Sequence, residues 1–162
     1  MTTLTGSTKA VPPEENSLVH LLAIEQIRQL KARYFRMIDT KDWEGFAAVF
    51  TPDATMVAGH FSITGSDAIA ASVAAALSGI VTVHHGRTAE IEIDSSVTAH
   101  GIWAMSDYLY AGGDPETGLT GAGHYHESYV RTDVGWRSTG CDSVDCEWHL
   151  LLAGTTLRIW TT

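Results

Sequence analysis

Two adjacent histidines stand in TVHHGRTAEIEID, residues 82–94, a segment that otherwise has the alternation of a strand. An imidazole changes charge near neutral pH, so either histidine could serve as a general base. Neighbouring side chains on a strand point to opposite faces, and only one of the two can face a common interior. The apolar residues of this segment occupy odd positions, so a regular strand turns His85 inward. A glycine inside a strand often marks a bulge, and a bulge at Gly86 would turn His84 inward instead.

Asp39 is the carboxylate best placed to work with such a histidine, because it stands where the first predicted helix ends. An acid there opposes the negative end of the helix dipole by roughly a few tenths of a kcal/mol, so another interaction must offset this cost. Either Asp39 caps the next helix, or it points into a cavity between helix and sheet and orients a histidine. Tyr34 lies about one turn earlier on the apolar stripe. Its hydroxyl either makes one structural hydrogen bond or donates to a substrate oxygen.

A further acid, Asp107, lies in the strand-like segment 98–113, on the same face as Trp103 and Met105. A carboxylate in such apolar surroundings must have a hydrogen-bond or charge partner, or its pKa must be raised by desolvation. Asp107 therefore either makes a structural hydrogen bond to a neighbouring strand or belongs to a functional site.

The next segment, 119–133, contains the pair His124 and His126 on one face, with Tyr125 and Glu127 on the other. A His-x-His pair on a strand can bind metal, but a suitably spaced third ligand is missing here, because Glu127 is on the wrong face. We therefore expect no metal site. Two cysteines, Cys141 and Cys146, are too few for a thiolate zinc site, and their spacing does not suggest a local disulfide.

The elements that must position these residues follow from periodicity and turn signals. Apolar residues at three- and four-residue spacing predict a helix from about residue 16 to 38. The other predicted elements are a short helix over 42–50, strands over 54–59 and 60–65, a helix over 65–79 capped by Ser66, and long strands over 81–94, 98–113, 119–133 and 134–152. Long strands with short returns imply antiparallel pairing. The chain is thus predicted to be α+β, with helices on one face of a curved sheet.

Composition limits what kind of protein this is. The chain has 162 residues, 44% hydrophobic and 18% charged, which suits one globular domain over residues 16–162 behind a flexible arm over 1–15. A net charge of −9 argues against nucleic-acid binding. No apolar run reaches the roughly 18 residues of a membrane span, and the first ten residues lack the core of a signal peptide. We therefore expect a cytoplasmic protein that binds neither nucleic acid nor membrane.

The order of these features resembles the SnoaL-like branch of the nuclear transport factor two-like superfamily. The resemblance rests on IEQIRQLKARYFRMIDTKDWEGFAAVFTPDATM, on VHHG leading to EIEID, and on GHYHESYVRTDVGW, and it extends from about residue 22 to 136. It implies a cone-like curved antiparallel sheet, with N-terminal helices that enclose a pocket.

The resemblance also implies a site. Some members are dehydratases or a dehydrochlorinase, in which an aspartate at the end of the first helix and a histidine on the first long strand form a dyad. Asp39 and His84 match these two positions, which requires the bulge at Gly86. Tyr34 matches a helix tyrosine and Asp107 a strand acid that some members use. One departure is Thr88, where an asparagine often stands.

The resulting hypothesis is a cofactor-independent lyase or isomerase that removes a proton from a small hydrophobic substrate, which could be cyclic. His84 is the base, Asp39 orients it and Tyr34 completes the catalytic set. The residues expected to contact substrate are Asp107, Trp103, Met105, Tyr125, Arg137 and His85, the last lying behind His84. The alternatives are a binding cone without chemistry, in which Asp39 and the histidine are too far apart to hydrogen-bond, and an accessory subunit of a larger oxygenase. We expect a homo-oligomer, a trimer before a dimer.

Overall fold

The computed structural model describes residues 13–112, 114, 116–152 and 155–160. Its helices are α1 (Pro13–Thr40), α2 (Trp43–Ala47) and α3 (Ser66–Ala76). The inner side of α1 carries the predicted apolar stripe, in which Ile27, Leu30 and Ile38 are buried. The helix ends at Thr40, and the next residue, Lys41, is a non-glycine residue with a positive φ of 61°. Residues 13–15, expected in the arm, belong to α1, and residues 1–12 lie outside the described part of the chain.

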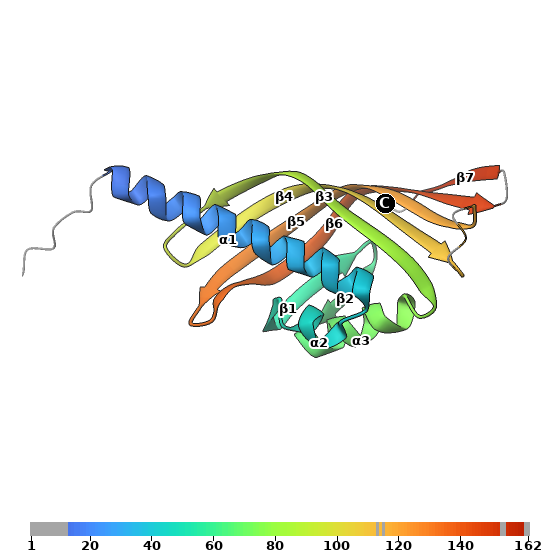
Figure 1. Cartoon of the computed structure of the whole chain (residues 1–162), viewed down its shortest axis with the longest axis horizontal. Helices are drawn as coiled ribbons and strands as arrows, with labels where there is room; N and C mark the ends of the chain where they lie inside the picture. Colours follow the sequence, from blue (N-terminus) through green and yellow to red (C-terminus); the bar gives the residue numbers. More distant parts are fainter. Residues whose placement is uncertain (1–12, 113, 115, 153–154, 161–162) are drawn as a thin grey trace, which may run out of the picture.

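The described strands form one curved sheet of seven strands (Figure 1). Their bounds are β1 (Phe50–Ala58), β2 (Phe61–Thr64), β3 (Ile80–Ile93), β4 (Thr98–Ala111), β5 (Gly118–Thr132), β6 (Gly135–Leu152) and β7 (Thr155–Trp160). The order is β2-β1-β6-β5-β4-β3, and β7 pairs with the last part of β6. The α+β cone predicted from the sequence is thus the fold of this chain.

The sheet is mixed rather than wholly antiparallel, which corrects the expectation from short returns. β1 runs parallel to β6, with Met56 opposite Cys141, whereas the other pairs of strands are antiparallel. Parallel neighbours cannot be joined by a tight turn, and here α3 and three long strands separate them along the chain. A further correction concerns α3, whose N-cap is Gly65 with no side-chain cap hydrogen bond, not Ser66.

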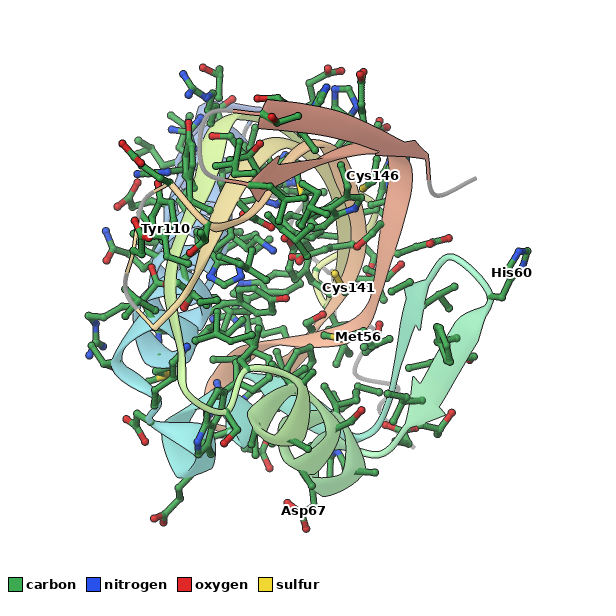
Figure 2. All side chains as sticks on the ribbon, turned by 90° about the vertical axis from the view of Figure 1, so that its right-hand side faces the viewer. Met56, His60, Asp67, Tyr110, Cys141 and Cys146 are labelled. Carbon is green, nitrogen blue, oxygen red and sulfur yellow. The ribbon has the colours of Figure 1, made fainter. Side chains whose placement is uncertain are left out.

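The helix α1 crosses the sheet (Figure 1), and the core fills the space between them. Figure 2 shows the long strands curling around packed side chains, with the β1–β2 hairpin projecting to one side and His60 pointing away at its tip. The inner faces of β4 and β5 supply Trp103, Met105, Tyr125 and Tyr129 to the core. The concave side of the sheet therefore holds most of the residues singled out from the sequence.

Candidate functional site

A bulge in β3 decides which histidine faces the interior. His84, His85 and Gly86 pair in regular register with β4, but the next paired residue is Ala89 opposite Trp103, so the register shifts between Gly86 and Ala89. Before the bulge the even positions face inward: Thr82 is buried, whereas Val81 is 51% exposed. After it, Ala89 and the following odd positions pack against the core. His84 is therefore the inward histidine.

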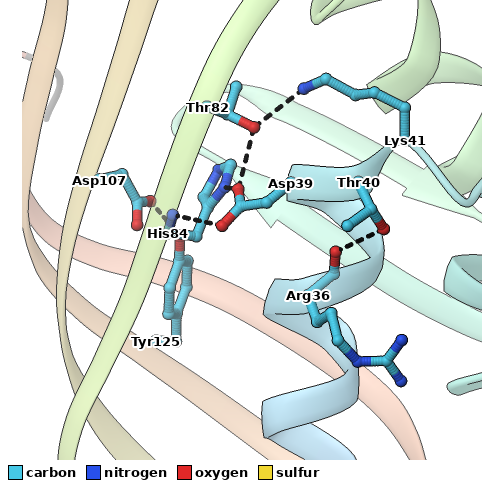
Figure 3. A network of polar contacts seen from close by, with 8 residues as sticks. All are labelled: Arg36, Asp39, Thr40, Lys41, Thr82, His84, Asp107 and Tyr125. Atoms are coloured by element: carbon cyan, nitrogen blue, oxygen red, sulfur yellow. Dashed lines mark hydrogen bonds and ion pairs between the residues drawn. The ribbon is translucent and has the colours of Figure 1, made fainter.

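His84 and Asp39 form a hydrogen-bonded pair (Figure 3). His84 Nδ1 lies 2.7 Å from Asp39 Oδ1, and the His84 backbone N–H donates to Asp39 Oδ2 at 3.0 Å. The His84 side chain is 9% exposed and that of Asp39 is 26% exposed, so the pair keeps contact with solvent. Asp39 does not cap α2, since Asp42 accepts from the Gly45 N–H in that role. Of the two interpretations of Asp39, the structure supports the one that pairs it with a histidine.

A second layer of contacts fixes Asp39. Thr82 Oγ1 donates to Asp39 Oδ1 at 2.9 Å and itself accepts from Lys41 Nζ at 2.9 Å. Partial burial would by itself raise the pKa of Asp39, but the hydrogen bonds from His84 outweigh it and the pKa is lowered. Asp39 thus stays ionised and can accept a hydrogen bond from an N–H at His84 Nδ1; in the tautomer that carries its proton there, the lone pair of the ring is on Nε2.

Asp107 stands directly opposite His84 on the neighbouring strand β4. The Tyr125 hydroxyl donates to Asp107 Oδ2, whereas Oδ1 has no hydrogen-bond partner among the described residues. Burial raises the pKa of Asp107, against the opposing influences of His84 and of the Tyr125 hydroxyl. A half-satisfied carboxyl with a raised pKa, next to a histidine, can exchange a proton with a bound molecule.

Tyr34 lies in a layer of aromatic rings. Its ring makes edge contacts with Phe35, Phe46 and Phe50 at centroid distances of 5.4, 5.1 and 5.9 Å. Burial, together with the nearby Cys141 thiol, raises the pKa of Tyr34 well above its ordinary value, so the phenol stays protonated.

Sequence reasoning missed a buried ion pair in the same layer. Lys31 donates to Glu127, and their side chains are 1% and 3% exposed. The ammonium also lies over the rings of Tyr34 and Tyr125, 3.9 and 4.1 Å from their centroids. Tyr129 completes the cluster by donating to Glu127. A signal was available, because Lys31 follows Ile27 by four residues on the apolar stripe of α1 and Glu127 alternates with inward tyrosines.

Two of the expected substrate contacts are not brought to the dyad. His85 is exposed on the outer face, where its ring meets that of Tyr108 at 6.1 Å. Arg137 lines a groove of about 660 Å³ with α2 and α3, and donates to the Trp136 carbonyl oxygen at 2.9 Å. Trp103 and Met105 do face inward, and Trp103 Nε1 donates to the Tyr129 hydroxyl at 2.8 Å.

Metal-binding side chains do not gather in the described residues. Within that part of the chain, no three His, Cys, Asp or Glu side chains converge to hold one. None of the described helices is both long and apolar enough to cross a membrane.

Comparison with known proteins places the chain in a family. Residues 19–142 match the SnoaL-like domain, and the chain belongs to this family, within the NTF2-like superfamily. The resemblance inferred from the sequence motifs is therefore confirmed.

Solved structures share the fold at low identity. A scytalone dehydratase-like protein from Novosphingobium aromaticivorans has a TM-score of 0.73 at 19% identity, with 90% of this chain and 93% of that chain covered. The hexachlorocyclohexane dehydrochlorinase LinA type 2 has a TM-score of 0.70 at 16% identity, covering 90% and 95%. A protein of unknown function from Mycobacterium tuberculosis has a TM-score of 0.67 at 26% identity, with 76% of each chain covered.

Proposed function

We propose that this protein is a cofactor-independent lyase that eliminates water or halide from a small hydrophobic substrate, with His84 as the base. The observation that carries the proposal is the 2.7 Å contact between His84 Nδ1 and Asp39 Oδ1, with Asp107 directly opposite on β4. A binding protein without catalytic activity does not need an imidazole held by a carboxylate. That alternative predicts Asp39 and the inward histidine too far apart to hydrogen-bond. The solved structures similar to this chain include a scytalone dehydratase-like protein and a dehydrochlorinase.

The first chemical step is proton removal. His84 Nε2 accepts a proton from a substrate carbon, the electron pair of the broken C–H bond forms a C=C bond, and the leaving group departs from the neighbouring carbon with its own bonding pair. The imidazolium that results is stabilised by ionised Asp39, which also holds the ring. General-base catalysis of this kind contributes about 10²–10⁴ in rate.

A departing hydroxyl group needs a proton, and Asp107 is the acid best placed to supply it. Burial raises the pKa of Asp107 and so favours its protonated form, and Tyr125 holds Oδ2 so that Oδ1 is left for the substrate. Donation from Asp107 releases the hydroxyl as water, whereas a halide leaves without a proton. The released water then passes the proton from His84 to the Asp107 carboxylate: it gives one proton to Asp107 and takes one from the imidazolium. Both groups are thereby back in their starting state.

The test uses 3-hydroxycyclohexanone in D₂O, followed by NMR. We expect deuterium uptake beside the carbonyl and formation of cyclohexenone above the buffer rate. His84→Ala should lower both rates about 100-fold or more. Asp39→Asn should lower them less, because the base remains but loses its orienting partner. His85→Ala should act as the wild type. Equal activity of wild type and His84→Ala would falsify the proposal.

We also propose that the chain forms a homo-oligomer, a trimer before a dimer, through the outer face of β3 and β4. Val81 and Val83 are exposed there, and Tyr108 and Tyr110 stack with their centroids 6.3 Å apart. Light scattering after size exclusion should give the mass of three chains. Val83→Lys should shift the protein to smaller species, and a wild-type monomer would contradict this interface.

A further inference from the structure

One row of residues crosses the concave face of the sheet and includes the dyad histidine. His84 pairs with Asp107, Asp107 pairs with Gly121 on β5, and Gly121 pairs with Trp148 on β6. Residues directly opposite each other on antiparallel strands point to the same face. Trp148 therefore shares the inner face with His84. With strands about 4.8 Å apart, its backbone lies about 14 Å along the row from that of His84.

The indole of Trp148 lies flat on Gly121. A Cβ atom added to Gly121 would stand 2.7, 2.8 and 2.9 Å from Cζ3, Cε3 and Cη2 of the indole. Nearly equal distances to three consecutive ring atoms place this position over the face of the ring and not at its edge. The backbone of Gly121 does not have the positive φ that would itself call for glycine. The glycine is explained by the space that the indole needs.

One face of the indole thus covers β5, and the other is turned away from the strand. Trp148 is only half-buried and packs against the edge of the core. The row continues from Gly121 to Asp107, whose Oδ1 lacks a partner among the described residues. A flat aromatic face near an unsatisfied carboxyl is suited to a ring that carries an oxygen substituent.

We propose that Trp148 is a substrate-contacting residue that receives a flat, unsaturated ring of the substrate on the face of its indole that is turned away from β5. A ring stacked there lies above Gly121, and its edge points along the row to Asp107 and His84. The substrate class is a planar ring that is joined at that edge to a saturated part, whose carbon atoms carry the proton and the leaving group next to a hydroxyl or carbonyl group. The role of His84 as base rests on the proposed function, but the ring seat on Trp148 can be tested by binding alone.

The experiment compares two probes with the same carbon skeleton, 1-naphthol and decahydro-1-naphthol, by titration calorimetry. Only the first is flat. Trp148→Leu keeps apolar bulk but removes the aromatic face, so it should weaken 1-naphthol binding about 2- to 10-fold and change decahydro-1-naphthol binding less than about 2-fold. Trp148→Phe should restore part of the preference. Trp43→Leu, at a half-buried tryptophan on α2, is the matched control and should match the wild type.

Equal weakening of both probes by Trp148→Leu would overturn the proposal, because the indole would then supply only bulk. Failure of 1-naphthol to bind the wild type would overturn it too. His84→Ala should keep the preference for 1-naphthol, since the ring seat does not need the base. If this preference is present while the wild type shows no elimination, the ring seat stands and the proposed function fails.

Discussion

Neutralising one partner of the buried Lys31–Glu127 pair should be far more damaging than neutralising both. Both side chains are almost fully enclosed, at 1% and 3% exposed. Lys31→Met leaves the Glu127 carboxylate without its counter-charge, which costs about 3–5 kcal/mol when a buried pair is broken. It also removes the cation from over the rings of Tyr34 and Tyr125, each contact being worth about 0.5–2 kcal/mol. Since small domains have about 5–15 kcal/mol of stability, this single change should bring the chain close to unfolding.

The double variant Lys31→Met with Glu127→Gln removes both charges, and the amide introduced at position 127 would still offer an oxygen to the Tyr129 hydroxyl. Replacing a whole buried ion pair by neutral groups of similar volume is often close to neutral. We therefore expect the double variant to be about 3–5 kcal/mol more stable than Lys31→Met, which is the cost of the uncompensated carboxylate, while the loss of the cation–ring contacts remains. Urea denaturation followed by far-ultraviolet circular dichroism gives these free energies.

The matched control is Arg28→Met, which removes a cation one turn earlier on the same helix at an exposed position. It should change stability by less than about 0.5 kcal/mol. The reasoning is refuted if the double variant is as unstable as Lys31→Met, because the loss would then come from packing around the lysine and not from an uncompensated charge.

Three further predictions concern the bulge and the two acids. Gly86→Ala should cost about 1–3 kcal/mol in urea, because the new Cβ would lie 2.5 Å from the Phe35 ring; unchanged stability would mean that α1 does not rest on this glycine. The pKa of Asp39 is lowered on folding, so ionised Asp39 stabilises the folded state above its unfolded pKa of about 3.9. This stabilisation is lost as the pH falls through the folded pKa, and the stability curves of Asp39→Asn and wild type should therefore converge in acid. The pKa of Asp107 is raised on folding, so the folded state binds its proton more tightly and the free energy of unfolding falls as the pH rises above about 3.9. Asp107→Asn should remove this fall, and identical pH profiles of variant and wild type would contradict the prediction.

The sequence predicted each described element except β7, although β1 begins at Phe50, inside the predicted second helix. Periodicity could not decide which face of β3 is turned inward. Val81 and Val83 are apolar yet lie on the outer face, so the alternation that includes them points to His85. Family resemblance selected His84, and the register shift after Gly86 agrees with it. Periodicity assumes one unbroken register, and a bulge changes the face of every residue on one side of it.

The sequence also could not predict which distant segments would contact one another. The parallel pairing of β1 with β6 joins Met56 to Cys141, and no local pattern records which of several strands will be neighbours. The Lys31–Glu127 pair likewise joins residues 96 positions apart. In the sequence, Lys31 and Glu127 are each a charged residue at a position where an apolar one is expected. Only the fold shows that the two charges neutralise each other.

The same fold explains why the dyad forms where it does. Phe35 rests on Gly86, where the missing side chain leaves room for its ring. From Phe35 to Asp39, α1 advances four residues, or about 6 Å, along the same face. From Gly86 back to His84, β3 covers two residues, or about 6.6 Å, again on one face. The two steps match, so fixing Phe35 on Gly86 also brings Asp39 to His84. A larger residue at position 86 should therefore disturb the hydrogen bond between Asp39 and His84 as well as the packing of α1, which couples the stability of the bulge to the activity proposed for the site.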